Sequence, residues 1–274
     1  MSLTPDTFRG KVALVTGAGS GMGSAAALAF ARAGADLVLA GRRRPELETV
    51  ARTIEAEGVR ALVVPTDVAL PGDVAALVAA AVERFGRLDA AFNNAGIEGA
   101  FAPITELTPD QFDETMSINL RGAWLCCKHE LAAMRSLGNG GAVVNTSSWL
   151  AHGAFPGSSI YSASKAALDG MIRALAQEVA DVGIRINNVN PGIIDTPMFR
   201  RFADDAAAIP FVQHTPARRL GTSEDVAEVV VWLCSEAARF VTGQNLLVDG
   251  GYSIPGHRAW VAGEIKPDQA DRLS

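Results

Sequence analysis

Tyr161 and Lys165 are the residues whose types and spacing most clearly suggest chemistry, in the segment SSIYSASKAALDG. On a helix, residues four apart share a face, so a phenol and an ammonium would reach one site. A phenol with an ordinary pKa of about 10 is a poor base at neutral pH, but a nearby ammonium stabilises the phenolate. Tyr161 could then donate a proton to a carbonyl or accept one from an alcohol. An amphipathic surface helix with an incidental aromatic residue fits the same spacing.

A glycine-rich segment, TGAGSGMG at Thr16 to Gly23, follows the first apolar run and precedes an alanine-rich stretch. Gly17 can take a tight turn, Gly21 lets backbone approach a pyrophosphate, and Gly23 lets a helix pack closely on a strand. The phosphate would bind at the helix N-terminus, where free N–H groups point outward. A plain strand-to-helix turn is the alternative, but the position after the first expected strand favours dinucleotide binding.

Three consecutive arginines, Arg42 to Arg44, stand directly before a proline. In a dinucleotide-binding fold, an acidic residue at the end of the second strand selects NAD, whereas an arginine accommodates the 2′-phosphate of NADP. The acidic position falls at Gly41, and Arg42 follows it with a guanidinium that can bind phosphate bidentately. Arg43 or Arg44 could add a contact. We therefore expect NADP(H) to be favoured over NAD(H), with a solvated loop as the alternative.

Short runs rich in Val, Ile and Leu alternate with alanine-rich helical stretches, a pattern typical of parallel strands joined by helices. We expect an α/β fold: a doubly wound, Rossmann-like, seven-stranded parallel sheet with helices on both faces. Two helix starts, at Thr108 and Thr222, have capping-box sequences. The expected strands lie in residues 11–17, 35–41, 60–68, 88–96, 141–148, 184–192 and 244–251.

The length of 274 residues predicts one domain over 1–274, with a core of about 11–252. Two segments do not follow the alternation: 195–220, which contains three phenylalanines, and the C-terminal extension 253–274, which includes His257 and Trp260. A loop as long as the first, inside a compact domain, is usually functional or mobile.

The net charge of −6 gives no support to nucleic-acid binding. Three cysteines, Cys126, Cys127 and Cys234, lack metal-site spacing, so we expect no metal and a reducing cytoplasmic location. The N-terminus has no apolar segment of signal-peptide length, and no run of about 18 apolar residues occurs, so we expect neither export nor membrane partners.

Four motifs in this order resemble the short-chain dehydrogenases/reductases, NAD(P)-dependent oxidoreductases with a single Rossmann-like domain. The glycine loop is similar to their TGxxxGxG, NNAG (93–96) to the motif after their fourth strand, and YSASK (161–165) to their YxxxK. NPGIIDTPM (190–198) resembles the PGxxxT segment beside their nicotinamide. The resemblance covers about residues 11–252. Epimerases and dehydratases of the wider superfamily usually carry a larger C-terminal domain, for which this chain has no room.

The resemblance implies a catalytic set of Asn119, Ser148, Tyr161 and Lys165. Ser148 precedes Tyr161 by thirteen positions, as the family's serine does, whereas Ser147 is interpreted as a structural hydroxyl. The backbone at Asn119 would hold a water that links Lys165 to solvent. Further implied cofactor contacts, beside Tyr161, Lys165 and Arg42, are Gly17, Ser20, Gly21, Met22, Gly23, Asp67, Val68, Asn94, Ala95, Gly96, Pro191, Gly192, Ile194 and Thr196.

The resemblance also implies an oxidoreductase acting on a ketone or secondary alcohol, with segment 195–220 as a substrate lid. Homotetramers are common in the family, and the helices around 124–134 and 167–179 carry more apolar residues than one buried face requires. A dinucleotide-binding sensor without turnover would be expected to lack one of the catalytic residues. Side chains that could face the pocket are Glu98, Trp149, His152, Phe155, Met198, Phe199, Phe202 and Phe211.

Overall fold

Every segment expected to form a strand does so in the computed structural model, which describes residues 4–254. The interpretation of residues 255–274, including His257 and Trp260, lies outside the described residues. The strands are β1 (Val12–Thr16), β2 (Asp36–Gly41), β3 (Ala61–Pro65), β4 (Ala90–Asn93), β5 (Gly141–Thr146), β6 (Ile184–Pro191) and β7 (Asn245–Val248).

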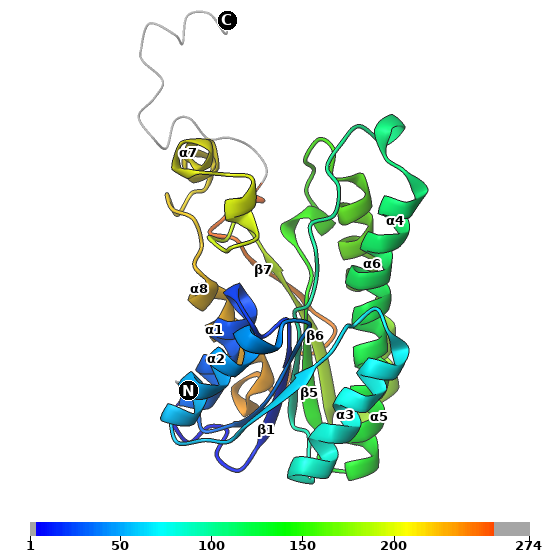
Figure 1. Ribbon diagram of the computed structural model, residues 1–274, viewed down its shortest axis with the longest axis vertical. Helices are drawn as coiled ribbons and strands as arrows, with labels where there is room; N and C mark the ends of the chain where they lie inside the picture. The colour runs from blue at the N-terminus through cyan, green and yellow to red at the C-terminus, as the bar shows by residue number, and fades with distance from the viewer. Residues whose placement is uncertain (1–3, 255–274) are drawn as a thin grey trace, which may run out of the picture.

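All seven strands are parallel and lie in the order β3-β2-β1-β4-β5-β6-β7, which confirms the expected doubly wound sheet. Parallel sheets need cover on both faces, and helices provide it (Figure 1). One face carries α1 (Gly21–Arg32), α2 (Arg44–Ala56) and α8 (Ser223–Cys234). The other carries α3 (Pro71–Phe85), α5 (Ala123–Leu137) and α6 (Ser159–Val179).

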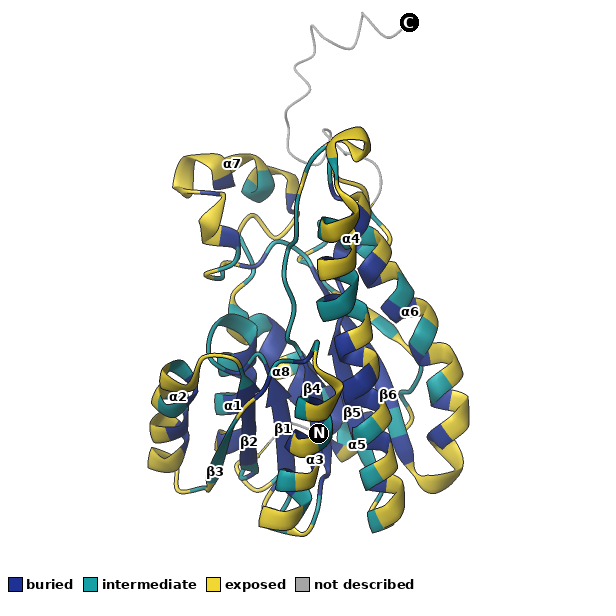
Figure 2. Ribbon diagram, turned by 45° about the vertical axis from the view of Figure 1, so that its right-hand side comes forward, coloured by how far each residue is buried: buried dark blue, intermediate teal, exposed yellow. Residues whose placement is uncertain are grey.

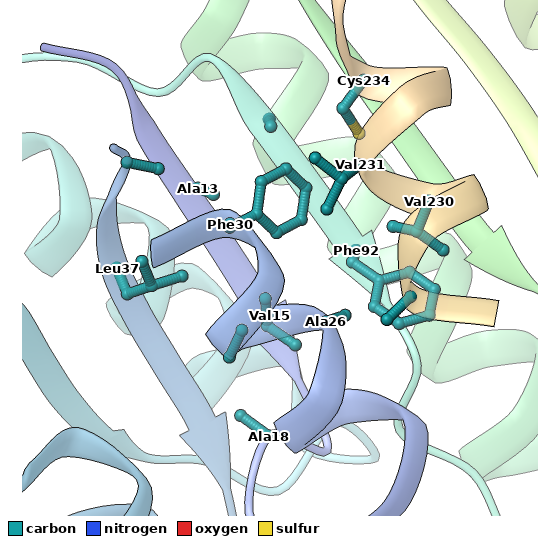
Figure 3. Packing of buried hydrophobic residues seen from close by; sticks show 14 of the residues in the cluster. Ala13, Val15, Ala18, Ala26, Phe30, Leu37, Phe92, Val230, Val231 and Cys234 are labelled. Carbon is teal, nitrogen blue, oxygen red and sulfur yellow. The ribbon is translucent and has the colours of Figure 1, made fainter. Parts of the chain in front are cut away.

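The alternation of side chains along β1 builds both hydrophobic cores. Ala13 and Val15 pack toward α1 and α8, whereas Leu14 packs toward the opposite helices. Figure 3 shows the ring of Phe30, from α1, beside Val231 of α8 in the first core. Because strands buried on both faces are apolar at nearly every position, the sequence makes them easy to recognise. Figure 2 shows the central strands buried and the outer helix surfaces exposed.

Two helices begin at the capping boxes that the sequence predicts. The Thr108 hydroxyl accepts a hydrogen bond from the Gln111 N–H (3.3 Å), and the Thr108 N–H donates to Gln111 Oε1 (2.9 Å), at the start of α4 (Pro109–Met116). Thr222 and Asp225 make the same reciprocal pair at the start of α8. These pairs satisfy backbone donors that the first helical turn leaves free.

Two local features were not predicted. A π-helical turn, Ser117–Gly122, joins α4 to α5 and contains Asn119. Segment 195–220 is not a simple loop, because it contains a short 3-10 turn, Phe199–Arg201, and α7 (Asp205–His214). A parallel bridge between Ile194 and Gly221 joins the ends of this segment, and α7 lies beyond the carboxyl ends of the strands (Figure 1). No helix within residues 4–254 has the length and apolar character to cross a membrane.

Candidate active site

The candidate site lies at the carboxyl ends of the strands, between the neighbours β1 and β4. Here the strand order reverses: β2 and β3 are added on one side of β1, and β4 to β7 on the other. Ligands of open α/β sheets bind in the crevice at this point. Most of the predicted site residues lie in the turns after β1, β4, β5 and β6 and in the first two turns of α6. Asn119 lies in the π-helical turn, and Arg42, Asp67 and Val68 follow β2 and β3. Since parallel strands end at the same edge, segments far apart in sequence meet there.

The glycine loop after β1 has the geometry of an anion cradle. Gly17 adopts a φ of 65°, which favours glycine, and a Cβ on Gly23 would lie 2.2 Å from the Gly17 carbonyl oxygen. Ser20 is the N-cap of α1, yet its side chain makes no capping hydrogen bond, and the first turn contains no acidic residue. The exposed N–H groups of this turn therefore fit a pyrophosphate.

The loop after β4 is fixed to the glycine loop by Thr16. Its hydroxyl accepts hydrogen bonds from the N–H groups of Asn94 (3.0 Å) and Ala95 (3.1 Å). A Cβ on Gly96 would lie 3.2 Å from Asn119 Oδ1 and 3.7 Å from Lys165 Nζ. Because Gly96 has no Cβ, space beside the lysine remains open for a bound ligand.

The side chain of Asn119 ties the π-helical turn to this loop. Its amide accepts from the Ile97 N–H and donates to the Ile97 carbonyl, both at 2.8 Å. The side-chain nitrogen also lies 3.3 Å from the Ser164 hydroxyl. Asn119 itself is 1% exposed, and its contact with Ser164 is buried. The residue thus connects the turn, the NNAG loop and α6.

Lys165 lies buried on α6 and donates from Nζ to the Thr146 carbonyl at 2.7 Å. Burial lowers the pKa of this ammonium to about 8, and the negative charge of Asp169 acts in the opposite direction. Its Nζ lies 5.6 Å from the centre of the Tyr161 ring. The pair thus shares one face of α6, as the spacing predicts.

The pKa of Tyr161 is raised to about 12, whereas the sequence argument had expected the lysine to lower it. Loss of hydration around the phenol is the largest cause, hydrogen bonding with the Ser148 side chain opposes it, and the charge of Glu98 adds to it. The residue spacing points only to the ammonium, but desolvation of the phenol is the larger effect here. Tyr161 is consequently a protonated phenol at neutral pH.

The two serines after β5 occupy different environments. Ser148 begins a 3-10 turn, Trp149–Ala151, and its hydroxyl accepts from the Leu150 N–H at 3.1 Å. Ser147 is buried and donates to the Lys165 carbonyl at 3.2 Å. Both serines and Tyr161 line the same cavity, so the two serines differ in their hydrogen bonds and not in their access to it. The contacts of Ser147 with backbone are those of a structural hydroxyl.

The three arginines after β2 differ in their partners. Arg43 forms an ion pair with Glu46 (3.4 Å), and Arg44 forms one with Glu48 (3.4 Å). Arg42 is exposed and pairs with no carboxylate of residues 4–254. The acidic residues of α2 therefore account for two of the three positive charges, and Arg42 remains available to an anion.

Asp67 and Val68 follow the carboxyl end of β3, which lies next to the end of β2 where Arg42 is found. The Asp67 carboxylate accepts from the Ala69 N–H at 3.0 Å, which stabilises its own turn. Val68 is buried against the π-helical turn, where a Cβ on Gly122 would lie 2.8 Å from it. These residues lie outside the cavity that contains Ser148 and Tyr161.

A cavity of about 160 Å³ opens beside Ser148 and Tyr161. Glu98 is the charged residue in its lining, and both carboxylate oxygens are bound by Arg201 of segment 195–220, at 2.9 and 2.6 Å. Of the predicted pocket residues, all but His152 line this cavity. Four lining residues were missed: Phe101, Thr146, Leu150 and Ile193. Phe101 belongs to the loop after a strand end that the motifs mark. Besides Tyr161, the aromatic lining comprises Phe101, Trp149, Phe155, Phe199, Phe202 and Phe211, and the predicted cofactor residues at the border are Met22, Pro191, Gly192, Ile194 and Thr196.

A second hollow, of about 440 Å³, lies between α1, α2 and the start of α8. Gly21 and Pro197 border it, but none of the predicted catalytic residues does. The chemistry therefore belongs to the smaller cavity.

A buried polar network lies beneath the site, on the α5 and α6 side of the sheet. Asn93, Asn145, Asn188 and Asn245 are aligned in register across β4 to β7. Each amide nitrogen donates to the next side-chain oxygen, at 3.0, 3.1 and 2.9 Å in turn. Asn93 also donates to the buried Glu130 of α5 at 2.9 Å. We call these four side chains the asparagine ladder.

A sequence model of the family described as enoyl-(acyl carrier protein) reductase matches residues 17–253. Among curated relatives, the A-factor type gamma-butyrolactone 1′-reductase of Streptomyces virginiae is 40% identical, over 89% of this chain and 96% of its own length. The cis-4-hydroxycyclohexanecarboxylate dehydrogenase of Sinomonas cyclohexanicum is 42% identical, over 90% and 98%. The cyclohexanol dehydrogenase of an Acinetobacter strain is 39% identical, over 90% and 96%.

Solved structures agree with the fold. A levodione reductase is 38% identical, with a TM-score of 0.88, over 91% of this chain and all of its own. The 3-ketoacyl-(acyl-carrier-protein) reductase of Brucella melitensis, complexed with NADH, is 35% identical, with a TM-score of 0.84, over 90% and 100%.

Proposed function

Because the chain belongs to the short-chain dehydrogenase/reductase family, we propose that it interconverts a ketone and a secondary alcohol, with NADP(H) favoured over NAD(H). It is an NAD(P)-dependent oxidoreductase of the alcohol dehydrogenase and ketone reductase type. The observation that carries the proposal is the meeting of Ser148 and Tyr161 at one cavity, with Lys165 against the tyrosine ring.

The nicotinamide, when bound, supplies a hydride for reduction or takes one up for oxidation. The chain supplies the proton and polarises the substrate carbonyl. In reduction, the Tyr161 phenol donates its proton to the carbonyl oxygen, and the Ser148 hydroxyl stabilises the charge that develops there. The Lys165 ammonium stabilises the phenolate that results, until a proton returns through Lys165 and the water that the Asn119 backbone would hold. Oxidation runs through the same proton positions in reverse.

The residues of the chain fit a dinucleotide along the strand ends. The α1 N-terminus and Gly17, Gly21 and Gly23 would hold the pyrophosphate, and Lys165 would bond the nicotinamide ribose. Pro191, Gly192, Ile194 and Thr196 would contact the nicotinamide, and Asn94, Ala95 and Gly96 would lie along the middle of the cofactor. Ser20 and Met22 would border the phosphates. Asp67 and Val68 would contact adenine.

The unpaired Arg42 supports NADP(H), because a 2′-phosphate would supply the negative partner that α2 provides for the two following arginines. NAD(H) is the alternative, and the Brucella melitensis neighbour was crystallised with NADH. The distinction therefore depends on Arg42.

The aromatic lining of the cavity supports a small apolar ring as the substrate. Seven aromatic side chains, Tyr161 among them, line the cavity, and predominantly apolar, aromatic linings suit apolar ligands. The names of two relatives point to six-membered rings. Glu98 places a negative charge in the lining. We therefore expect an uncharged cyclohexanone to be accepted more readily than the same ring bearing a carboxylate.

The surface supports self-association. Trp124 of α5 is 45% exposed, and Leu246 and Leu247 of β7 are 37% and 44% exposed. Apolar side chains of this size on two of the elements by which the family assembles favour a homotetramer. A cytoplasmic location remains our expectation from the three cysteines, which are buried and unpaired.

The test is a set of initial rates with NADPH and NADH, using cyclohexanone, 4-oxocyclohexanecarboxylate and a linear ketone. We expect NADPH and cyclohexanone to be preferred by the wild type. Arg42→Asp should move the preference toward NADH, whereas Arg44→Asp, whose arginine already pairs with Glu48, should change it less. A wild-type preference for NADH of about tenfold or more would overturn the cofactor proposal. Tight cofactor binding without turnover of any ketone, unaffected by Tyr161→Phe, would support a sensor instead.

A further inference from the structure

Asp169 is a buried carboxylate on α6 that the proposed chemistry does not use. It lies one helical turn beyond Lys165 and is 4% exposed. Charged side chains are seldom buried without partners, because the loss of hydration is costly. The Asp169 carboxylate has three partners, two on β6 and one just after the turn that follows β5.

The first two partners belong to β6. Asn188 donates to Asp169 Oδ1 at 3.0 Å, and Asn190 donates to Oδ2 at 2.9 Å. The Asn190 nitrogen also lies 3.1 Å from the Ser148 carbonyl and 3.3 Å from the Ser147 hydroxyl. Asn190 immediately precedes Pro191 and Gly192 at the cavity border. Asp169 therefore orients an amide that is bonded to the backbone of Ser148.

The third partner is His152, just after the 3-10 turn that Ser148 begins. Its Nε2 lies 2.8 Å from Asp169 Oδ2, while half of its side chain is exposed. The turn is thus held at both ends: at its start through Asn190, and at its end through His152. The sequence pointed to His152 as a pocket residue, but the structure directs it away from the cavity lining and onto Asp169.

We propose that Asp169 is a positioning residue: through Asn190 and His152 it fixes the turn that carries Ser148, and its negative charge supports the Lys165 ammonium. Asp169 does not line the cavity. The second part rests on the proposed function, whereas the first concerns only the fold around Ser148.

The groups that act on Lys165 and Tyr161 are few. On α6 the titratable neighbours of the ammonium are Tyr161 and Asp169, and Asp169 raises the lysine pKa against the effect of burial. The loop after β4 places Glu98 near Tyr161, with Arg201 bound to it. The strand β5 and the π-helical turn present Thr146 and Asn119, which do not titrate. His152 faces Asp169 from the turn after β5.

Hydrogen exchange tests the first part without turnover. The N–H groups of Ala151, His152 and Gly153 bond to the carbonyls of Ser148 and Trp149 within the turn. We expect exchange at these amides to be about tenfold faster in Asp169→Asn and in His152→Ala. His152→Gln can still donate to the carboxylate and should restore the wild-type rate. Glu178→Gln, which removes an exposed charge from the same helix, is the matched control.

The pH profile of ketone reduction tests the second part. Removing the carboxylate lowers the Lys165 pKa further, so the loss of kcat at alkaline pH should begin at least about half a unit lower in Asp169→Asn. Glu178→Gln should leave that limb in place. A purely structural role would lower the stability without moving the limb.

Unchanged exchange in Asp169→Asn and His152→Ala would overturn the positioning of the turn, and an unmoved alkaline limb would overturn the support of Lys165. If Asp169→Asn does not fold, the comparison of His152→Ala with His152→Gln tests the proposal. Equal amide exchange rates in these two variants overturn it. A wild type that reduces no ketone refutes the proposed function instead, since the exchange experiment needs no substrate.

Discussion

The Lys165 ammonium lies 5.6 Å from the centre of the Tyr161 ring and directs its hydrogen bond at the Thr146 carbonyl, 2.7 Å away. The backbone of β5 therefore fixes the lysine, and its charge acts on the phenol through space. Since burial keeps the proton on Tyr161 at neutral pH, the site is prepared to donate a proton to a carbonyl.

Replacing Tyr161 by phenylalanine should abolish proton transfer and preserve the shape of the site. We expect kcat for ketone reduction to fall by roughly 10²- to 10⁴-fold, which is the usual contribution of general acid catalysis. Cofactor affinity, measured by fluorescence titration, should change little. Tyr252→Phe is a suitable control, because the chain has two tyrosines and the second keeps its ring contact with Trp149. Equal activity in wild type and Tyr161→Phe would refute the assigned role.

Adding a methyl group to the glycine loop should destroy the cradle. A Cβ at Gly23 would lie 2.2 Å from the Gly17 carbonyl oxygen, so Gly23→Ala must displace backbone. We expect loss of cofactor binding, or of the fold, in a thermal-shift titration with NADPH. Gly72→Ala places its methyl group in open space within α3 and should raise stability by about 0.5–1 kcal/mol. Normal NADPH binding by Gly23→Ala would mean that phosphate binds elsewhere.

The ion pair between Arg201 and Glu98 joins segment 195–220 to the loop after β4. The arginine side chain is 58% exposed, and such pairs contribute at most about 1 kcal/mol, which corresponds to roughly a fivefold effect. We expect Arg201→Ala to raise KM for the ketone by up to that factor, and added salt to reproduce part of the rise in wild type. Within the described part of the chain, Arg200 pairs with Asp195 and Asp205, which both belong to the same segment. If Arg200→Ala changes KM as much as Arg201→Ala does, the ion pair between segment 195–220 and the loop after β4 is not what affects ketone binding.

Glu130 should make the protein less stable as the pH rises. Burial raises its pKa to about 7, against an ordinary 4.5, and the hydrogen bond from Asn93 opposes this shift. Between these two values the folded protein holds a proton that the unfolded chain releases. Stability therefore falls with rising pH across this window, by roughly 1.4 kcal/mol per unit.

Glu130→Gln removes this linkage. In urea unfolding we expect the variant to be more stable than wild type by about 1–3 kcal/mol at pH 8, and to differ little near pH 5. Glu114→Gln, at an exposed position of α4, should leave the pH dependence unchanged. If Glu130→Gln keeps the wild-type slope between pH 5 and 7, another group is responsible for it.

Much of the fold was predictable because it depends on local patterns. Strands buried on both faces are continuous apolar runs, and the capping boxes of Thr108 and Thr222 satisfy backbone donors within four residues. The glycine, tyrosine and lysine motifs mark strand ends and one helix face, so their convergence followed from the topology. The family was recognisable for the same reason.

The rest depends on partners that sequence spacing does not reveal. Asp169 is an ordinary polar position on α6 until β6 brings Asn188 and Asn190 against it. The Tyr161 pKa was expected to fall, because the spacing shows the ammonium four residues away but not the burial of the phenol. The π-helical turn at Asn119 depends on bonds to Ile97, twenty-two residues away. In each case a tertiary contact outweighs the local pattern.

The asparagine ladder also bears on how the chain folds. Its three rungs join residues 52, 43 and 57 positions apart, so they close only when β4 to β7 have come together. A slip of one residue in any of these strands would turn its amide to the opposite, apolar face and leave the neighbouring amides without partners. The ladder thereby penalises misaligned sheets, and a chain that assembles with the wrong register is destabilised before the catalytic pocket can form.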